Sequence, residues 1–200
     1  MCLYFSFRRT FFNQTAFRLR QHRRIAACRA VSPWSPARGW ILMTAHSYVE
    51  CTASCLAALC EFRRLPPTLS TSAMELSVHR GMSWLRRGQR PDGSRPGFWG
   101  VHFDYGTLFG IRGLLAAGAR SDDWAIRKAC DWLVSRQRPD GGWGEHFRGC
   151  LIGQYVEHGE SQVIHTAWAL IALLEAQALQ RDTIERRIRF LSDMQSENWS

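Results

Sequence analysis

The sequence has 200 residues, 46% of them hydrophobic, and a formal net charge of +9. This length and apolar content suffice for one domain with its own core. Eight of the 26 basic residues lie in 1–49, which contains no Asp or Glu, and the 18 others nearly balance the 17 acidic residues. A nucleic-acid-binding domain would spread basic side chains over a folded face, so this distribution argues against nucleic acid as a partner.

Residues 1–45 form a basic arm in which Phe and Arg alternate in clusters. We expect the arm to be disordered or non-native. Three interpretations stay open: an organelle transit peptide, a start that comes from an intron or a truncated gene model, and a basic segment that lies on a membrane surface. No apolar run approaches 18 residues, so the sequence predicts no transmembrane helix.

From Ser47 onward the pattern is helical. Apolar periodicity, capping residues and proline breaks predict six helices, at 47–62, 72–87, 107–117, 122–136, 162–174 and 182–194. Ser and Glu at a spacing of three predict capping boxes at Ser47/Glu50 and Ser72/Glu75, so we interpret Glu50 as a helix cap and not as a catalytic acid. The segment holds no strand longer than a few residues.

The predicted helices alternate in character. Those at 47–62, 107–117 and 162–174 are apolar on most sides, whereas those at 72–87, 122–136 and 182–194 have one polar face. Such alternation is expected of two concentric layers of helices.

A turn motif repeats after the amphipathic helices. Gln137 is followed by Pro-Asp-Gly141-Gly and then Trp143, and the same arrangement occurs 48 residues earlier, from Gln89 through Gly93 to Arg95. A third copy begins at Gln195. Pro, Asp and Gly supply the turn chemistry, and we expect the Gln amide and the Trp indole to fasten one helix to the next. Asp92 and Asp140 are interpreted as turn residues.

This motif resembles the Gln-Trp repeat of the triterpene cyclases. The segments 48–52 (Tyr-Val-Glu-Cys-Thr), 98–110 and 165–170 are similar to the oxidosqualene branch of that family, the lanosterol and cycloartenol synthases. The resemblance implies that residues 46–200 form part of an all-α α/α barrel, the C-terminal catalytic domain. Six helices would make about half of a ring, and we expect a missing barrel half or a second domain to cover its open side.

The resemblance also implies a chemistry. Such cyclases protonate oxidosqualene with an Asp in an Asp-Cys-Thr-Ala-Glu motif and guide a carbocation through an aromatic cavity. This chain lacks the motif, so we expect it to be inactive alone. Cys51 corresponds to a cysteine that supports the acid, and Tyr105, Leu108 and Phe109 correspond to cavity positions, Leu108 replacing a tryptophan that faces the cation.

The sequence predicts no cofactor and no metal ligands, since its seven cysteines and seven histidines show neither Cys-x-x-Cys nor His-Glu-x-x-His spacing. The implied partners are an apolar polyene, oxidosqualene, and the surface of a lipid droplet or the endoplasmic reticulum, to which the chain would bind without spanning it. Two alternatives remain. One is a non-catalytic helical-repeat scaffold or a degenerate gene product; the other is a prenyltransferase β-subunit, which shares the barrel and needs Asp, Cys and His as zinc ligands.

Overall fold

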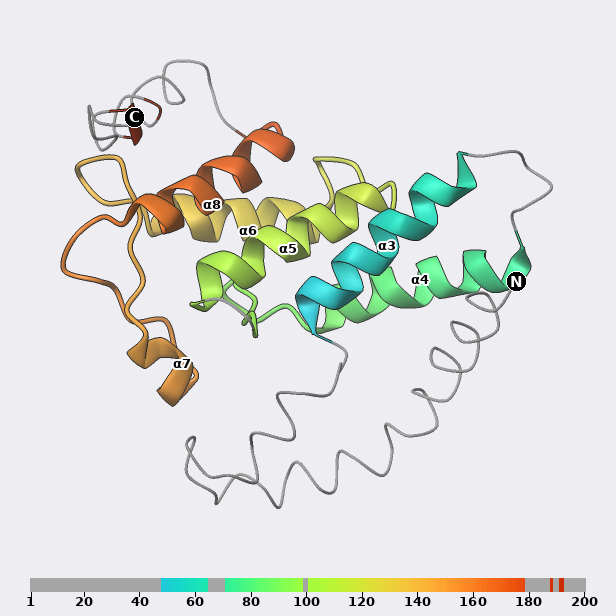
Figure 1. Ribbon diagram of the computed structural model, residues 1–200, viewed down its shortest axis with the longest axis horizontal. Coiled ribbons are helices and arrows are strands. Elements are labelled where there is room, and N and C mark those ends of the chain that lie inside the picture. The colour runs from blue at the N-terminus through green and yellow to red at the C-terminus, as the bar shows by residue number, and fades with distance from the viewer. Residues whose placement is uncertain (1–47, 65–70, 99–100, 179–187, 189–190, 193–200) are drawn as a thin grey trace, which may run out of the picture. The chain divides into compact units, whose positions relative to one another are not determined.

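A computed structural model describes residues 48–64, 71–98, 101–178, 188 and 191–192 (Figure 1). The named helices are α3 (Val49–Arg63), α4 (Ser72–Arg87), α5 (Phe103–Ala116), α6 (Trp124–Ser135), α7 (Arg148–Ile152) and α8 (Val163–Glu175). All lie within one compact unit, Ala45–Ser200. The arm, Gln195 and nearly all of the predicted helix at 182–194 fall outside the described residues.

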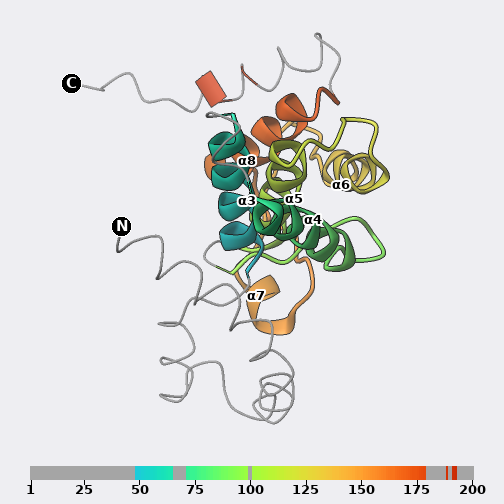
Figure 2. The same ribbon diagram turned by 90° about the vertical axis from the view of Figure 1, so that its right-hand side faces the viewer.

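Helix α5 is the centre of the unit. It packs most extensively against α3 and α8, which flank it, and also contacts α4 and α6 (Figures 1 and 2). Viewed end-on, α3, α5 and α8 lie together, while α4 and α6 lie on the other side of α5 (Figure 2). The prediction of an all-α fold is confirmed, since no strand occurs among the described residues beyond one isolated bridge between Glu145 and Glu157.

The core lies between these two groups of helices. Its most deeply buried aliphatic side chains come from four helices: Leu85, Ile111, Leu114, Ile126, Leu133 and Leu173. Helices α3 and α5 approach closely at Gly113, where an added Cβ would lie 2.9 Å from the Cα of Ala53. A side chain at this position would therefore push the two helices apart.

Helix α8 departs from the prediction that it is buried on most sides. Four of its apolar side chains, Val163, Ile164, Ile171 and Leu174, are between 37% and 54% exposed. The reason is that α5 and α6 cover only part of its circumference within the described residues. An apolar side of α8 is therefore left uncovered in this unit.

Three predicted helix starts or caps differ from the structure. The N-cap of α3 is Tyr48, without a side-chain cap bond, so the capping box at Ser47 is wrong, and the Oε1 atom of Glu50 instead accepts the N–H of Phe98 at 2.5 Å. Helix α4 begins at Ser72 as predicted, but its N-cap is Thr71, whose hydroxyl accepts the N–H of Met74, so the capping box at Ser72 is wrong. Helix α5 begins at Phe103, four residues before its predicted start, because Glu145 binds the free N–H groups of its first turn. The short helix α7 was not predicted.

Candidate functional site

The second repeat turn, residues 137–143, is closed by hydrogen bonds of its own and contacts two helices. The Gln137 side chain donates to the Gly141 carbonyl at 2.8 Å, and the fully buried indole of Trp143 donates to the Leu133 carbonyl in the last turn of α6 at 2.7 Å. The backbone N–H of Trp143 donates to the hydroxyl of Thr166 in α8 at 3.0 Å. The turn therefore fastens α6 to α8.

The first repeat turn, residues 89–95, has the same geometry with a different last residue. Gln89 donates to the carbonyls of Gly93 and Ala125, at 2.8 and 2.9 Å. Arg95 takes the place of the indole: its guanidinium donates to the Leu85 carbonyl, and its backbone N–H donates to the hydroxyl of Thr107 at 3.0 Å. Arg95 thus occupies the position that the tryptophan has in the second repeat.

Arg95 is a buried charge. Its side chain is 2% exposed, and its Nε and Nη2 atoms have no hydrogen-bond partner among the described residues. Burial lowers the pKa of Arg95 from 12.5 to about 10; nearby Asp123 opposes this decrease and Arg86 adds to it. The substitution of the tryptophan has therefore placed an incompletely compensated cation in the interior.

Both repeat turns need glycine at their bend. Gly93 has φ +101° and Gly141 has φ +90°, conformations that residues with a Cβ rarely adopt. The Asp residues stabilise the turns as predicted: Asp92 accepts the backbone N–H of Ser94 at 3.0 Å, and Asp140 accepts that of Gly142 at 3.0 Å.

The predicted cavity residues lie on two helices. Tyr105 of α5 is half-buried, and its ring centroid lies 4.9 Å from those of both Phe109 and Trp168. Cys51 of α3 is also half-buried. Leu108, by contrast, is 2% exposed and belongs to the hydrophobic core. The structure therefore brings three aromatic rings together and packs Leu108 inside the protein.

The electrostatics around Cys51 favour its neutral thiol. Burial raises the pKa of Cys51, and the charge of Glu50 adds to the effect. Burial, with Glu50 and Cys51, also raises the pKa of Tyr105, and burial followed by Cys51 and Glu50 raises that of Tyr48 to about 12. These mutual influences place the four groups in one neighbourhood. A neutral thiol here can donate a hydrogen bond to a carboxylate.

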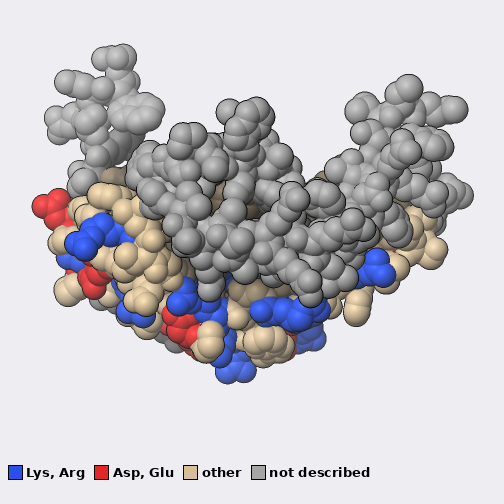
Figure 3. All heavy atoms as spheres, turned by 90° about the horizontal axis from the view of Figure 1, so that it is seen from below, with Lys and Arg blue, Asp and Glu red and all other residues tan. Residues whose placement is uncertain are grey.

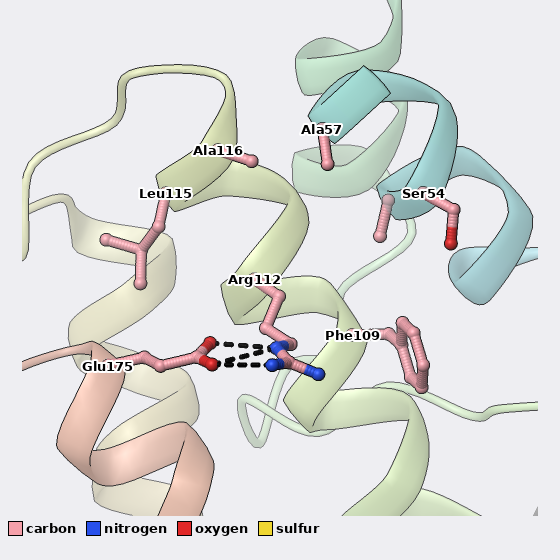
Figure 4. A pocket seen from close by; sticks show the side chains of 8 residues that line it. Ser54, Ala57, Phe109, Arg112, Leu115, Ala116 and Glu175 are labelled. Atoms are coloured by element: carbon pink, nitrogen blue, oxygen red, sulfur yellow. Dashed lines mark hydrogen bonds and ion pairs between the residues drawn. The ribbon is translucent and has the colours of Figure 1, made fainter. Parts of the chain in front are cut away.

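An open pocket of about 500 Å³ lies beside this region. Its lining comes from α3, α5 and α8: Ala53, Ser54, Ala57, Phe109, Arg112, Leu115, Ala116 and Glu175 (Figure 4). Arg112 and Glu175 form an ion pair across it, with 2.8 Å between Nη2 and Oε1. Phe109 is the predicted cavity residue that lines this pocket, and Cys51 and Tyr105 lie outside its lining.

A cluster of three buried titratable residues was missed at the level of sequence. Asp104 of α5, Glu145 after the second repeat turn and His165 of α8 are at most 3% exposed. One ligand atom from each lies within 4.8 Å of the others, and the Nδ1 atom of His165 is 3.0 Å from the Oδ2 atom of Asp104. Polar residues within otherwise apolar helical segments were the signal that could have revealed the cluster.

Glu145 also holds the start of α5. Its carboxylate accepts the backbone N–H groups of His102, Phe103 and Asp104, at 2.8 to 3.1 Å. Burial raises the pKa of Glu145, and these N–H groups partly offset the increase. The cluster contains no cysteine, so it differs from the Asp, Cys and His set that a prenyltransferase β-subunit requires.

Charges on the surface are mixed in sign. Figure 3 shows Lys and Arg side chains scattered among acidic and uncharged ones on the face that it displays. Several basic residues are engaged with acids, among them Arg63 with Glu75 and Arg138 with Glu157, at 2.7 and 2.5 Å. The described surface thus offers no support for a nucleic-acid interface.

Comparisons with known proteins point to one family. Residues 40–200 match the model of the squalene-hopene cyclase C-terminal domain. The chain is 44% identical over 158 residues to cycloartenol synthase of Dictyostelium discoideum, 40% over 154 residues to alpha-onocerin synthase LCD of Lycopodium clavatum, and 36% over 161 residues to lanosterol synthase of Homo sapiens. These matches cover 74% to 78% of this chain and 20% to 22% of the relatives, so the chain spans about a fifth of their length.

Proposed function

We propose that this chain, which belongs to the squalene-hopene cyclase C-terminal domain family, is part of a triterpene synthase that cyclises oxidosqualene. The names of its relatives, lanosterol, cycloartenol and alpha-onocerin synthase, support cyclase-type chemistry. The chain then contributes three inner helices, α3, α5 and α8, to a barrel whose cavity holds the polyene.

The observation that carries this proposal is the aromatic group formed by Tyr105, Phe109 and Trp168, whose neighbouring centroids are 4.9 Å apart. Ring faces attract a carbocation as they attract an ammonium group, and apolar walls keep out the water that would quench it. Tyr105 is un-ionised near neutral pH, as any tyrosine with a pKa of 10 is, and burial raises its pKa further. An uncharged aromatic wall suits a cation that must migrate and not be trapped.

The supporting role of Cys51 fits the same proposal. Its thiol is neutral, since burial and Glu50 raise its pKa, so it can donate a hydrogen bond to a carboxylic acid supplied by a neighbouring segment. The acid itself is missing from the chain, which has no Asp-Cys-Thr-Ala-Glu segment. Asp104 cannot replace it, because a side chain with 0% exposure does not reach a substrate. We therefore expect the isolated chain to be inactive.

The uncovered apolar side of α8 supports the proposal that a partner covers this helix. Val163, Ile164, Ile171 and Leu174 expose apolar area, and burying such area contributes about 25 cal/mol per Å². We propose the remaining barrel half or the surface of a lipid droplet or the endoplasmic reticulum as the cover. No helix among the described residues is long and apolar enough to cross a membrane.

The test is cyclisation of oxidosqualene by two proteins, analysed by gas chromatography and mass spectrometry. One is the purified 200-residue chain, and the other is a fusion that adds an upstream segment with the Asp-Cys-Thr-Ala-Glu motif from a cyclase relative. We expect no cyclised product from the first. Product from the chain alone would refute the assignment of a missing acid.

The fusion protein tests whether the chain is part of a triterpene synthase. If the fused protein folds, as circular dichroism would show, and forms no product, the chain is a helical-repeat scaffold or a degenerate relative. A Cys51→Ala version of an active fusion should lose most of its rate, and a Cys150→Ala version, which alters an exposed cysteine, should keep it.

A further inference from the structure

We propose that Asp104, Glu145 and His165 form a binding site for one divalent transition-metal ion that prefers nitrogen and oxygen ligands, such as Zn²⁺. The site lies between the start of α5, the end of the second repeat turn and the start of α8. It is independent of the cyclase assignment, because it uses none of the cavity residues.

The donor atoms are already close to a coordination geometry. The three ligand atoms lie within 4.8 Å of one another. Zinc binds His nitrogen and carboxylate oxygen at about 2.0–2.2 Å in a tetrahedral arrangement, so two of its ligand atoms lie about 3.4 Å apart. Small side-chain rotations would therefore bring all three into contact with an ion.

An unpartnered oxygen points to a missing ligand. Asp104 is 0% exposed, and its Oδ1 atom has no hydrogen-bond partner among the described residues, although Oδ2 contacts His165. A buried carboxylate oxygen without a partner is unfavourable. A bound cation would satisfy it.

The charge balance favours a cation as well. Two carboxylates and one histidine lie together out of water. A divalent ion placed among them would neutralise both carboxylates at once.

The ligands are also oriented in advance. Glu145 is held by the three N–H groups of residues 102–104, and its Oε1 atom accepts just one of these bonds, at 3.1 Å. The ring of His165 packs edge-on against Trp168, with 5.2 Å between the centroids. Outer contacts of this kind fix ligand orientation in metal proteins.

Titration of the metal-free 200-residue chain with Co²⁺ tests the site. We expect one Co²⁺ per chain, visible d–d absorption, no thiolate-to-cobalt charge-transfer band, and a raised unfolding temperature with Co²⁺ or Zn²⁺. Asp104→Asn and His165→Gln should each weaken binding by about tenfold or more. His79→Gln, which alters an exposed histidine of α4, should bind as the unmodified chain does.

X-ray absorption of the Co²⁺-loaded unmodified chain keeps the test independent of variants that fail to fold. A first shell of nitrogen and oxygen that includes one imidazole supports the site. A shell containing sulfur, binding that survives in folded His165→Gln, or the absence of stoichiometric binding would overturn the proposal.

Discussion

Replacing Arg95 with tryptophan should stabilise this protein. The change restores the residue that the repeat uses at the equivalent position, where the indole of Trp143 donates to the Leu133 carbonyl at 2.7 Å. A tryptophan at position 95 can donate to the Leu85 carbonyl in the same way, because Arg95 already places a donor there. Gly110 packs directly against the Arg95 side chain, so a planar ring meets no opposing side chain at that position.

The expected gain follows from the buried charge. The pKa of Arg95 decreases from 12.5 to about 10. At about 1.4 kcal/mol per tenfold change in an equilibrium constant, that difference corresponds to roughly 3 kcal/mol of lost stability at neutral pH. Since 1 kcal/mol moves the midpoint of a protein of this size by about 2–4 °C, Arg95→Trp should raise the unfolding temperature by about 6–12 °C.

Thermal unfolding followed by circular dichroism measures the change in unfolding temperature, and two further variants serve as comparisons. Arg95→Met removes the charge but leaves the Leu85 carbonyl without its donor, so its gain should be smaller. Trp143→Arg makes the reverse exchange in the second repeat and should cost roughly 3 kcal/mol, because it buries a cation at the position equivalent to that of Arg95.

The pH dependence of the gain has a defined sign. Arg95 has a lower pKa when folded, so its destabilising effect is complete below about pH 10 and is relieved as the pH increases from there toward 12.5. The difference between Arg95→Trp and the unmodified chain should therefore shrink above pH 10. An unchanged or lower midpoint for Arg95→Trp at neutral pH would refute the argument.

Two further predictions concern the turns and the buried cluster. Gly93→Ala should destabilise the protein far more than Gly141→Ala. An added Cβ at Gly93 would lie 2.2 Å from the Lys128 carbonyl oxygen, whereas one at Gly141 would lie 3.9 Å from the nearest atom. Urea unfolding measures the loss of stability in both variants, and equal losses would contradict the steric reason. Burial raises the folded pKa of Glu145 and of Asp104 above their ordinary values of 4.5 and 3.8, so their contribution to stability should increase as the pH falls through the raised values toward the ordinary ones. Glu145→Gln should reduce that increase. It should also destabilise the protein at neutral pH, because the amide keeps one acceptor oxygen for the N–H groups of residues 102–104 but loses the second oxygen and the negative charge. Urea unfolding at stepped pH measures both effects, and an unchanged pH profile would count against this.

Much of the fold was predictable because helix and turn signals are local. The start of α4, the turn roles of Asp92 and Asp140, and the bends at Gly93 and Gly141 all depend on residues within a few positions of one another. The repeat added long-range information, since a motif that recurs must be used in the same way each time. In the second turn the Gln137 side chain bonds the Gly141 carbonyl within the turn, and the Trp143 indole bonds the Leu133 carbonyl of α6.

The incorrect predictions arise where a side chain that is distant in the sequence determines a local structure. Helix α5 begins at Phe103 because Glu145 caps it from 42 residues away, and Glu50 leaves its predicted capping role for the N–H of Phe98, 48 residues away. Asp104 and His165 meet although they are 61 positions apart. Nothing in the spacing of a single sequence indicates such pairings, because the paired groups lie in segments that are far apart along the chain.

The repeat turns connect the fold to the chemistry. Each turn binds one inner helix through a threonine hydroxyl: the N–H of residue 95 donates to Thr107 in α5, and that of residue 143 donates to Thr166 in α8. Thr166 directly follows His165, and Glu145 lies two residues beyond Trp143. The second turn therefore positions two of the three proposed metal ligands, whereas the first reaches only α5, three residues after Asp104. It follows that Trp143→Arg should weaken Co²⁺ binding strongly, while Arg95→Trp should raise stability and leave that binding nearly unchanged.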